Sequence, residues 1–125
     1  MENKALSAEK AFVKMAQICS RSEQCSADIR KKIIAYEIVE EIVDEIIEKL
    51  ISENYLDDER FVNAYISDKF RINKWGKVKM RYYLRMKGIK NEIIENGLNN
   101  IDEERYKKVL IKTMKDKAKA IRKKD

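Results

Sequence analysis

Histidine and proline are absent from the 125-residue sequence, and glycine and cysteine are scarce, with three and two residues respectively. An all-β protein needs many tight turns, which proline and glycine supply, so this fold class is excluded. Without histidine, Cys19 and Cys25 provide too few ligands for a zinc site. We therefore predict an all-α protein with no metal or other cofactor. Its two thiols are expected to be reduced, with a disulfide or redox role as the alternative.

Long apolar runs and catalytic signatures are also missing. No apolar run approaches the length of a membrane span, and the first ten residues have no apolar signal core. We therefore predict a cytoplasmic protein without a membrane partner. The sequence has no glycine-rich phosphate loop and no nucleophile with a base nearby. We predict no enzymatic activity and no small-molecule substrate, although side chains distant in sequence can still assemble a site in the fold.

Charge is the abundant property of this chain. Charged residues make up 40% and apolar residues 44%, which is too apolar for a disordered chain and suits exposed helices with thin cores. The net charge is +6 and the isoelectric point is about 9.2. Such a basic surplus favours nucleic acid or an acidic protein surface as the partner, and it does not choose between them.

Apolar residues recur at spacings of three and four, which predicts helices along most of the chain. The helix over 38–51 is rich in Ile and Val, whose helix propensity is low, so tertiary burial must hold it. Positions 37–59 contain ten acids and one base. We interpret this acidic face as solvated, with a contact patch as the alternative. Four of the expected helices cover residues 7–18, 38–51, 76–87 and 91–98. A further helix starts at residue 26 or at Ser22, and another runs from residue 57 or 58 to 73. The last helix starts after Asp102.

Three consecutive acids, Asp57, Asp58 and Glu59, stand at the start of one expected helix. Consecutive helical side chains point in different directions, so these carboxylates do not converge by themselves. Capping of free N–H groups and attraction to the helix dipole explain all three. We prefer this interpretation to a catalytic or metal-binding cluster.

A wholly basic segment follows, with nine Lys or Arg and no acid from Lys69 to Asn91. Gly88 is well placed as the left-handed residue that ends the helix over 76–87. On a helical wheel the core-facing residues of this helix are Met80, Tyr83 and Leu84. The outward-facing residues are Val78, Tyr82 and Arg85. A basic stripe beside the core comprises Lys77, Arg81 and Arg85.

The sequence repeats itself with a period of 45 to 50 residues. Two pairs of segments match. Residues 45–61 (EIIEKLISENYLDDERF) are similar to residues 92–106 (EIIENGLNNIDEERY), and residues 29–33 are similar to residues 80–84. Such repeats form stacked arrays with extended surfaces. We expect three-helix units at 1–55 and 56–101 in an elongated array, straight or curved. Residues 102–125 begin an incomplete third unit, whose tail at 115–125 is a fraying or exposed helical end; the chain is either naturally short or cut.

With the repeat in view, the chain resembles the RecX family of regulators of the RecA recombinase. The likeness is strongest in LDDERF at 56–61 and covers most of 7–105. It continues through Ala64, Tyr65, Gly76, Met80, Leu84 and Lys87-Gly88-Ile89. The first repeat matches through Ser26, Ile29, Lys32 and Ile33. It has Ala35-Tyr36 where the family pattern has Lys-Gly.

The resemblance implies a tandem array of three-helix units, usually three of them. It also implies binding to RecA–DNA filaments, which limits filament growth or promotes disassembly. Strand exchange and co-protease activity, and hence DNA repair and the SOS response, would be damped. The expected contacts with the filament or with DNA are Arg71, Lys74, Lys77, Arg81, Tyr82 and Arg85. The alternative for each basic residue is that it is merely solvated.

Two further functions stay open. The chain could bind DNA directly, as a helix-turn-helix module with 76–87 as the basic helix and Trp75 and Tyr82 stacked on bases. For Trp75 we prefer the interpretation of a hydrophobic plug at a helix junction. A plain helical scaffold for another protein is the third candidate.

Overall fold

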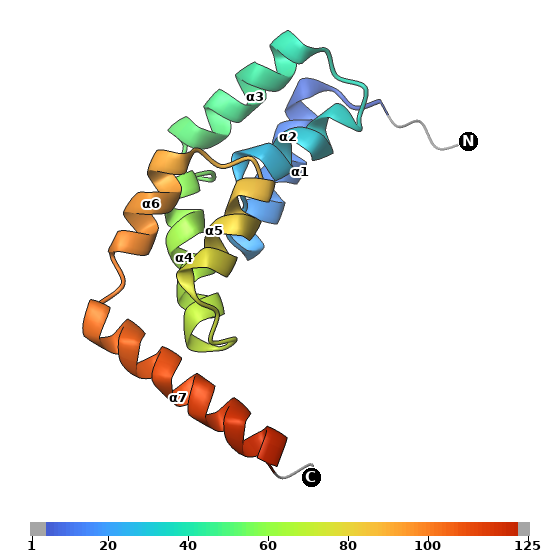
Figure 1. The fold of residues 1–125 in the computed structure, drawn as a ribbon. Helices are drawn as coiled ribbons and strands as arrows, with labels where there is room; N and C mark the ends of the chain where they lie inside the picture. Colours follow the sequence, from blue (N-terminus) through green and yellow to red (C-terminus); the bar gives the residue numbers. More distant parts are fainter. Residues whose placement is uncertain (1–4, 123–125) are drawn as a thin grey trace.

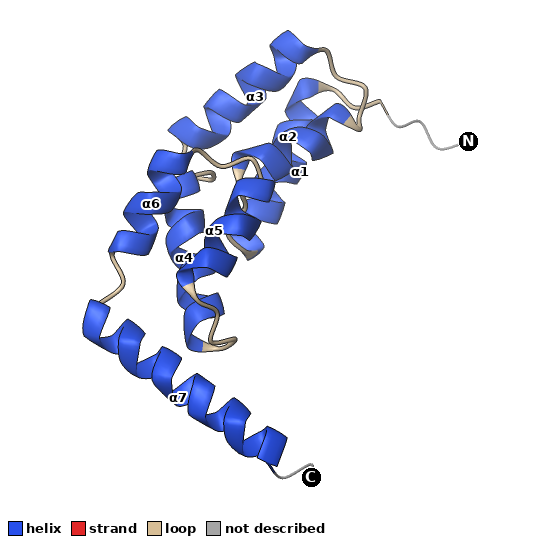
Figure 2. Cartoon of the chain, viewed as in Figure 1, coloured by secondary structure: helices blue, strands red, loops and turns tan. Residues whose placement is uncertain are grey.

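A computed structural model describes residues 5–122, and these residues form seven helices and no strand (Figure 1, Figure 2). The all-α fold predicted from the composition is therefore confirmed. None of the helices in the described part of the chain is both long and apolar enough to cross a membrane. The helices are α1 (Ala8–Arg21), α2 (Ser26–Ile34), α3 (Glu40–Ser52), α4 (Asp58–Arg71), α5 (Lys77–Met86), α6 (Asn91–Asn99) and α7 (Glu103–Arg122).

Side-chain caps begin α1 and α4, whereas α2, α3, α5 and α6 begin without one. Ser7 accepts a hydrogen bond from the Lys10 N–H at 3.3 Å and caps α1, as predicted. The predicted end of α1 at residue 18 was wrong by three residues. The polar residue Ser20 lies within the helix, and its hydroxyl donates to the Ala16 carbonyl at 2.8 Å, one turn back. Gly88 has φ +81°, which confirms the predicted left-handed stop after α5.

Two hydrophobic cores lie one after the other along the molecule. In the first core, α1 and α2 pack on α3, and in the second core α4 and α5 pack on α6. The first core contains Ala11, Met15, Ala16, Ile29, Ile33, Val43, Ile46, Ile47, Leu50 and Leu56. The second core contains Cys25, Val62, Ile66, Phe70, Met80, Leu84, Ile89, Ile94 and Leu98. Burial of the Ile and Val side chains of α3 thus offsets their low helix propensity.

The start of α2 joins the two cores. Cys25, which precedes α2, is fully buried in the second core. The Ser26 N–H donates to the Asp58 carboxylate at 2.8 Å, and the Lys87 ammonium lies 3.1 Å from the Asp28 carboxylate. These contacts attach α2 to the first turn of α4 and the end of α5.

An equivalent joint connects α5 to α7. The internal sequence match places Ser26 over Lys77 and Asp58 over Glu103. The Lys77 N–H donates to the Tyr106 hydroxyl at 2.8 Å, and the Lys77 ammonium lies 3.1 Å from Glu103. The start of a second helix therefore meets the first turn of the next unit's first helix at both joints.

Beyond that joint α7 extends away from the other helices (Figure 1). The Tyr106 ring lies 5.7 Å from the Phe70 ring, but none of residues 103–121 of α7 is buried. Met114 is 63% exposed and Ile121 is 68% exposed. The predicted exposed helical end is thus observed up to Ile121, the exposure of Arg122 is outside what the structure describes, and residues 123–125 lie outside the described part of the chain. The division at residues 55 and 101 remains our proposal.

Candidate partner-binding surface

The candidate surface is formed by the end of α4, the turn at 72–76 and the outer side of α5. Met80 and Leu84 are fully buried and fix the orientation of α5. Val78, Tyr82 and Arg85 are exposed, as predicted from the helical wheel. Tyr83 was predicted to face the core, and this was wrong: it is 40% exposed, because its ring packs on Trp75 at 5.1 Å instead.

Two of the six predicted contact residues are paired with the chain's own carboxylates. The Arg81 guanidinium makes a two-pronged ion pair with Glu95 of α6, at 2.5 and 3.2 Å. This bond raises the pKa of Arg81 and lowers the pKa of Glu95. Lys77 is paired with Glu103 at the joint to α7. Glu95 lies 14 positions after Arg81 in the sequence, and Glu103 lies 26 positions after Lys77. The charge pattern of the basic segment alone therefore did not indicate these pairs.

The other four predicted residues are exposed. Arg71 is the last residue of α4, and the Lys74 ammonium donates to its carbonyl at 2.7 Å, which satisfies one free carbonyl of the helix end. The Arg85 guanidinium donates to the Asn91 side-chain carbonyl at 2.9 Å. Within residues 5–122, no carboxylate lies within ion-pair distance of Arg71, Lys74 or Arg85. With Tyr82, these cations form the part of the predicted site that is open to a partner.

Sequence analysis did not identify a group of rings and lysines beside this surface, which we call the aromatic–lysine cluster. It consists of Tyr65, Lys69, Trp75, Lys79, Tyr82 and Tyr83. The ammonium groups of Lys79 and Lys69 lie 4.3 and 4.9 Å from the Trp75 ring centre. Trp75 is half-buried and also packs on the second core, in agreement with the predicted plug. The four-residue spacings of 65 and 69, and of 75, 79 and 83, were the signal available in the sequence.

The acidic residues show no convergence. Asp57 caps α4 by accepting from the Arg60 N–H at 3.1 Å, whereas Asp58 accepts from Ser26 across the joint. The carboxylates of α3 are exposed, and one of them, Asp44, pairs with Arg30 at 2.7 Å. Among the described residues, no three potential metal ligands lie close enough to hold an ion. These contacts support the capping and solvated-face interpretations.

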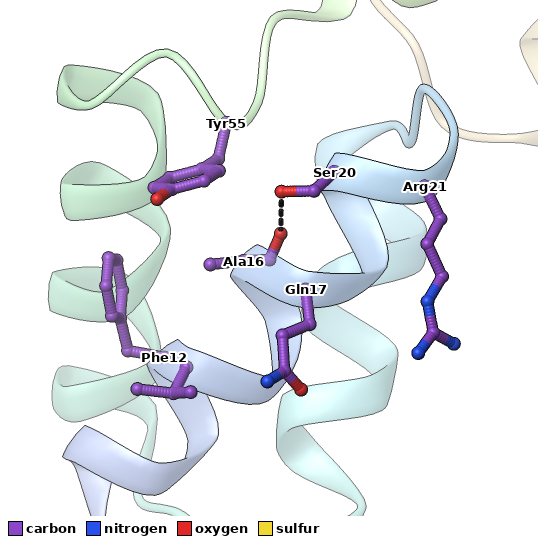
Figure 3. A pocket seen from close by; sticks show the side chains of 7 residues that line it. Phe12, Ala16, Gln17, Ser20, Arg21 and Tyr55 are labelled. Carbon is purple, nitrogen blue, oxygen red and sulfur yellow. Dashed lines mark hydrogen bonds between the residues drawn. The ribbon is translucent and has the colours of Figure 1, made fainter.

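A hollow of about 490 Å³ lies beside α1 on the first core (Figure 3). The rings of Phe12 and Tyr55 meet edge-on at its border, with centres 6.0 Å apart. Two hydroxyl groups line the hollow, those of Ser20 and Tyr55, and the Ser20 hydroxyl already donates to the Ala16 carbonyl. The lining contains no carboxylate, imidazole or thiol that could act as a base beside Ser20.

Comparison with known proteins shows where this chain is similar to others. Residues 57–98 match the family model described as RecX, second three-helix domain. The regulatory protein RecX of Clostridium botulinum (strain Eklund 17B / Type B) is 34% identical over 70 residues, which are 56% of this chain and 32% of that protein. The regulatory protein RecX of Clostridium beijerinckii is 31% identical over 109 residues, which are 87% of this chain and 50% of that protein.

A solved structure shows that the fold is also similar to that of a RecX protein. A crystal structure of regulatory protein RecX superposes with a TM-score of 0.74 and 26% identity. The superposition covers 82% of this chain and 50% of that chain. The chain therefore spans between about a third and a half of the length of these relatives.

Proposed function

Because this chain belongs to the RecX family of regulatory proteins, we propose that it binds RecA–DNA filaments and restrains them. Binding would limit filament growth or promote disassembly, and so reduce strand exchange and co-protease activity in DNA repair and the SOS response. We further propose that it acts in the cytoplasm by binding alone, without catalysis. The observation that carries this proposal is the exposed basic surface at Arg71, Lys74 and Arg85, which has no carboxylate within ion-pair distance in the described part of the chain.

The energetics of such a surface favour many weak contacts over one strong one. An exposed ion pair contributes only about 0–1 kcal/mol, so single pairs cannot hold a complex. A filament repeats its charges along its length, and a tandem array can meet several of them at once. Distributed pairs of this kind set orientation and association rate.

The six proposed contact residues differ in how accessible their side chains are to a partner. Arg71, Lys74, Tyr82 and Arg85 are exposed to a partner directly. Lys77 and Arg81 are half-buried and would have to exchange Glu103 and Glu95 for a partner's acids. Replacement of the exposed cations should therefore weaken binding without loss of the internal ion pairs.

The test is inhibition of the RecA ATPase on single-stranded DNA. We expect Arg71→Glu combined with Arg85→Glu to abolish most of the inhibition. Lys10→Glu combined with Lys14→Glu makes the same change in charge on the exposed side of α1 and should leave inhibition nearly intact. Equal inhibition by both double variants, with folding verified by circular dichroism, would remove this surface from the proposal.

Direct binding of double-stranded DNA is the second candidate function. It is favoured by the short turn between α4 and α5 and by the exposed outer side of α5, a helix-turn-helix arrangement. Salt titration separates the two candidates, because affinity for free DNA should fall with a slope near −0.9 per phosphate contacted. Tight binding to RecA-coated DNA with weak binding to bare DNA would favour the first candidate.

A further inference from the structure

We propose that the two three-helix groups carry equivalent hollows, and that each hollow binds a helical segment of an acidic protein through one apolar side chain and one carboxylate. The first hollow lies beside α1 (Figure 3), and the second hollow lies beside α4. The proposal does not depend on binding to RecA. Of the six proposed filament contacts, only Arg71 lines either hollow.

The two hollows occupy the same place along the first helix of each group. The helices α1 and α4 have 14 residues each, and their caps, Ser7 and Asp57, lie 50 positions apart. The α1 residues that line the first hollow and point to one side of the helix are Val13, Ala16, Gln17, Ser20 and Arg21. The five residues of α4 that lie 50 positions later all line the second hollow. A depression that recurs in the same register is a property of the repeated unit.

The opposite walls of the two hollows are also equivalent. Tyr55, which lies between α3 and α4, lines the first hollow. Asn100 and Asp102, which lie between α6 and α7, line the second hollow. The internal sequence match at the acidic triplets places Tyr55 over Asn100. Each hollow therefore lies between the first helix of a group and the segment that leads to the next group.

Each hollow has an apolar floor. The rings of Phe12 and Tyr55 and the buried Ala16 line the first hollow. Ile66 and Phe70, both buried, line the second hollow. The volumes are about 490 and 440 Å³, so each hollow has room for an aliphatic or aromatic side chain of a partner.

Each hollow also has a cation at the same end. Arg21 and Arg71 are the last residues of α1 and α4, and both are exposed. Within residues 5–122, no carboxylate lies within ion-pair distance of either guanidinium. Figure 3 shows Gln17 between Arg21 and the ring of Phe12. A guanidinium binds a carboxylate through two parallel hydrogen bonds, so a partner that fills the floor gains further affinity from an adjacent acid.

The low density of charge favours a protein over nucleic acid as the occupant. Arg21 is the one cation among the residues that line the first hollow, and in the second hollow Asp102 accompanies Arg71 and Arg105. A nucleic-acid backbone is bound by several cations that neutralise successive phosphates, which neither lining supplies. A helix with Leu and Glu one turn apart presents both side chains on one face and can lie in a groove.

The test uses a helical peptide in which Leu and Glu recur at four-residue spacings. In nitrogen–proton correlation spectra of the protein, we expect the amide signals of residues 12–21 and 63–71 to shift together on titration. Peptides with Leu replaced by Ser, or with Glu replaced by Gln, should bind about tenfold more weakly, because each loses one of the two contacts. Equal binding of all three peptides, or shifts at only one hollow, would overturn the proposal. Equally tight binding of decanoate, which also joins an alkyl chain to a carboxylate, or of oligothymidylate would overturn it as well.

Variants that retain the helices separate the hollows from general charge. Gln17→Glu and Ser67→Glu place an acid one turn before Arg21 and Arg71, which supports the helix and occupies the cation. Each variant should weaken peptide binding about tenfold at its own hollow and leave the other hollow unchanged. Lys14→Gln, at an exposed position of α1 outside the hollow, makes the same change in net charge and is the matched control. An equal loss in Lys14→Gln and Gln17→Glu would refute the site. Loss of peptide binding in Gln17→Glu with unchanged RecA inhibition would support the hollow and leave the filament proposal standing.

Discussion

Asp58 accepts a hydrogen bond from the Ser26 backbone N–H at 2.8 Å, although the two residues are 32 positions apart. The bond ties the first turn of α4 to the start of α2, and Lys87 reinforces the same joint through Asp28. The Arg60 guanidinium also pairs with the Glu23 carboxylate across this joint at 2.6 Å, so the joint sets how one three-helix group is placed on the next.

The first prediction concerns this bond. Asp58→Ala leaves a partly buried N–H at the start of α2 without its acceptor, which should lower the free energy of unfolding by about 1–3 kcal/mol. The neighbouring exposed Glu59 provides the control, and Glu59→Ala should change stability by less than about 0.5 kcal/mol. Urea unfolding followed by circular dichroism measures both. Equal stability of the two variants would show that the joint does not depend on Asp58.

The second prediction concerns a close approach of α6 to α4 at Gly97. A Cβ atom at Gly97 would lie 2.6 Å from the Val62 side chain and 2.9 Å from the Ile66 side chain. Overpacking of this kind costs about 1–3 kcal/mol, more than the 0.5–1 kcal/mol that alanine gains over glycine in a helix. Gly97→Ala should therefore destabilise the protein, whereas Asn96→Ala, at an exposed position of α6, should not.

A rescue variant tests the reason for that loss. Val62→Ala removes the methyl group that Gly97→Ala would meet, so the double variant should be less destabilised than the sum of the two single variants. Strict additivity in thermal unfolding would mean that the two positions do not touch in solution.

Local chemistry explains which parts of this structure were predictable from the sequence. The apolar period, the caps at Ser7 and Asp57 and the left-handed Gly88 depend on neighbouring residues, so the helices followed from the sequence. The role of Asp58 did not, because its partner Ser26 is 32 residues away. The repeat did place these two positions over Lys77 and Glu103, so one joint could have indicated the other.

The candidate surface was predicted less completely than the fold. The outward position of Tyr82 and Arg85 followed from the helical wheel. The pairing of Arg81 with Glu95 did not, because it depends on how α5 lies against α6. Tyr83 was misplaced because the wheel counts an aromatic residue as core, whereas Trp75 offered a ring contact near the surface.

The third prediction is a loss of stability in acid. Burial, the largest single effect, raises the pKa of Asp28, but the hydrogen bonds to Lys87 and Cys25 and the charges of Lys87 and Lys31 together bring it below the ordinary 3.8. The bond to Arg81 similarly lowers the pKa of Glu95 below 4.5. Carboxylates with a lowered pKa stabilise the fold above their unfolded pKa, and this contribution is lost as the pH falls through the folded value. Stability should therefore decline below about pH 4.5.

The carboxamide variants check this sign. Asp28→Asn combined with Glu95→Gln removes both titrations, so the double variant should be less stable than the natural protein at pH 7 and should lose less stability between pH 5 and pH 2. Urea midpoints across this range measure the difference. Parallel pH profiles of the two proteins would contradict the assigned ion pairs.

The fourth prediction concerns the attachment of α7. Tyr106→Phe keeps the ring on Phe70 but removes the hydroxyl that accepts from the Lys77 N–H. The loss of one such bond costs about 1 kcal/mol, which corresponds to roughly fivefold faster opening of the joint. Amide hydrogen exchange should therefore quicken in the first turns of α5 and α7, which this bond joins, and stay unchanged in α6. Lys108→Ala, at an exposed position of α7, should leave the exchange pattern unaltered. Faster exchange throughout α4 and α6 in Tyr106→Phe would mean that α7 supports the whole second core and is not held by this one joint.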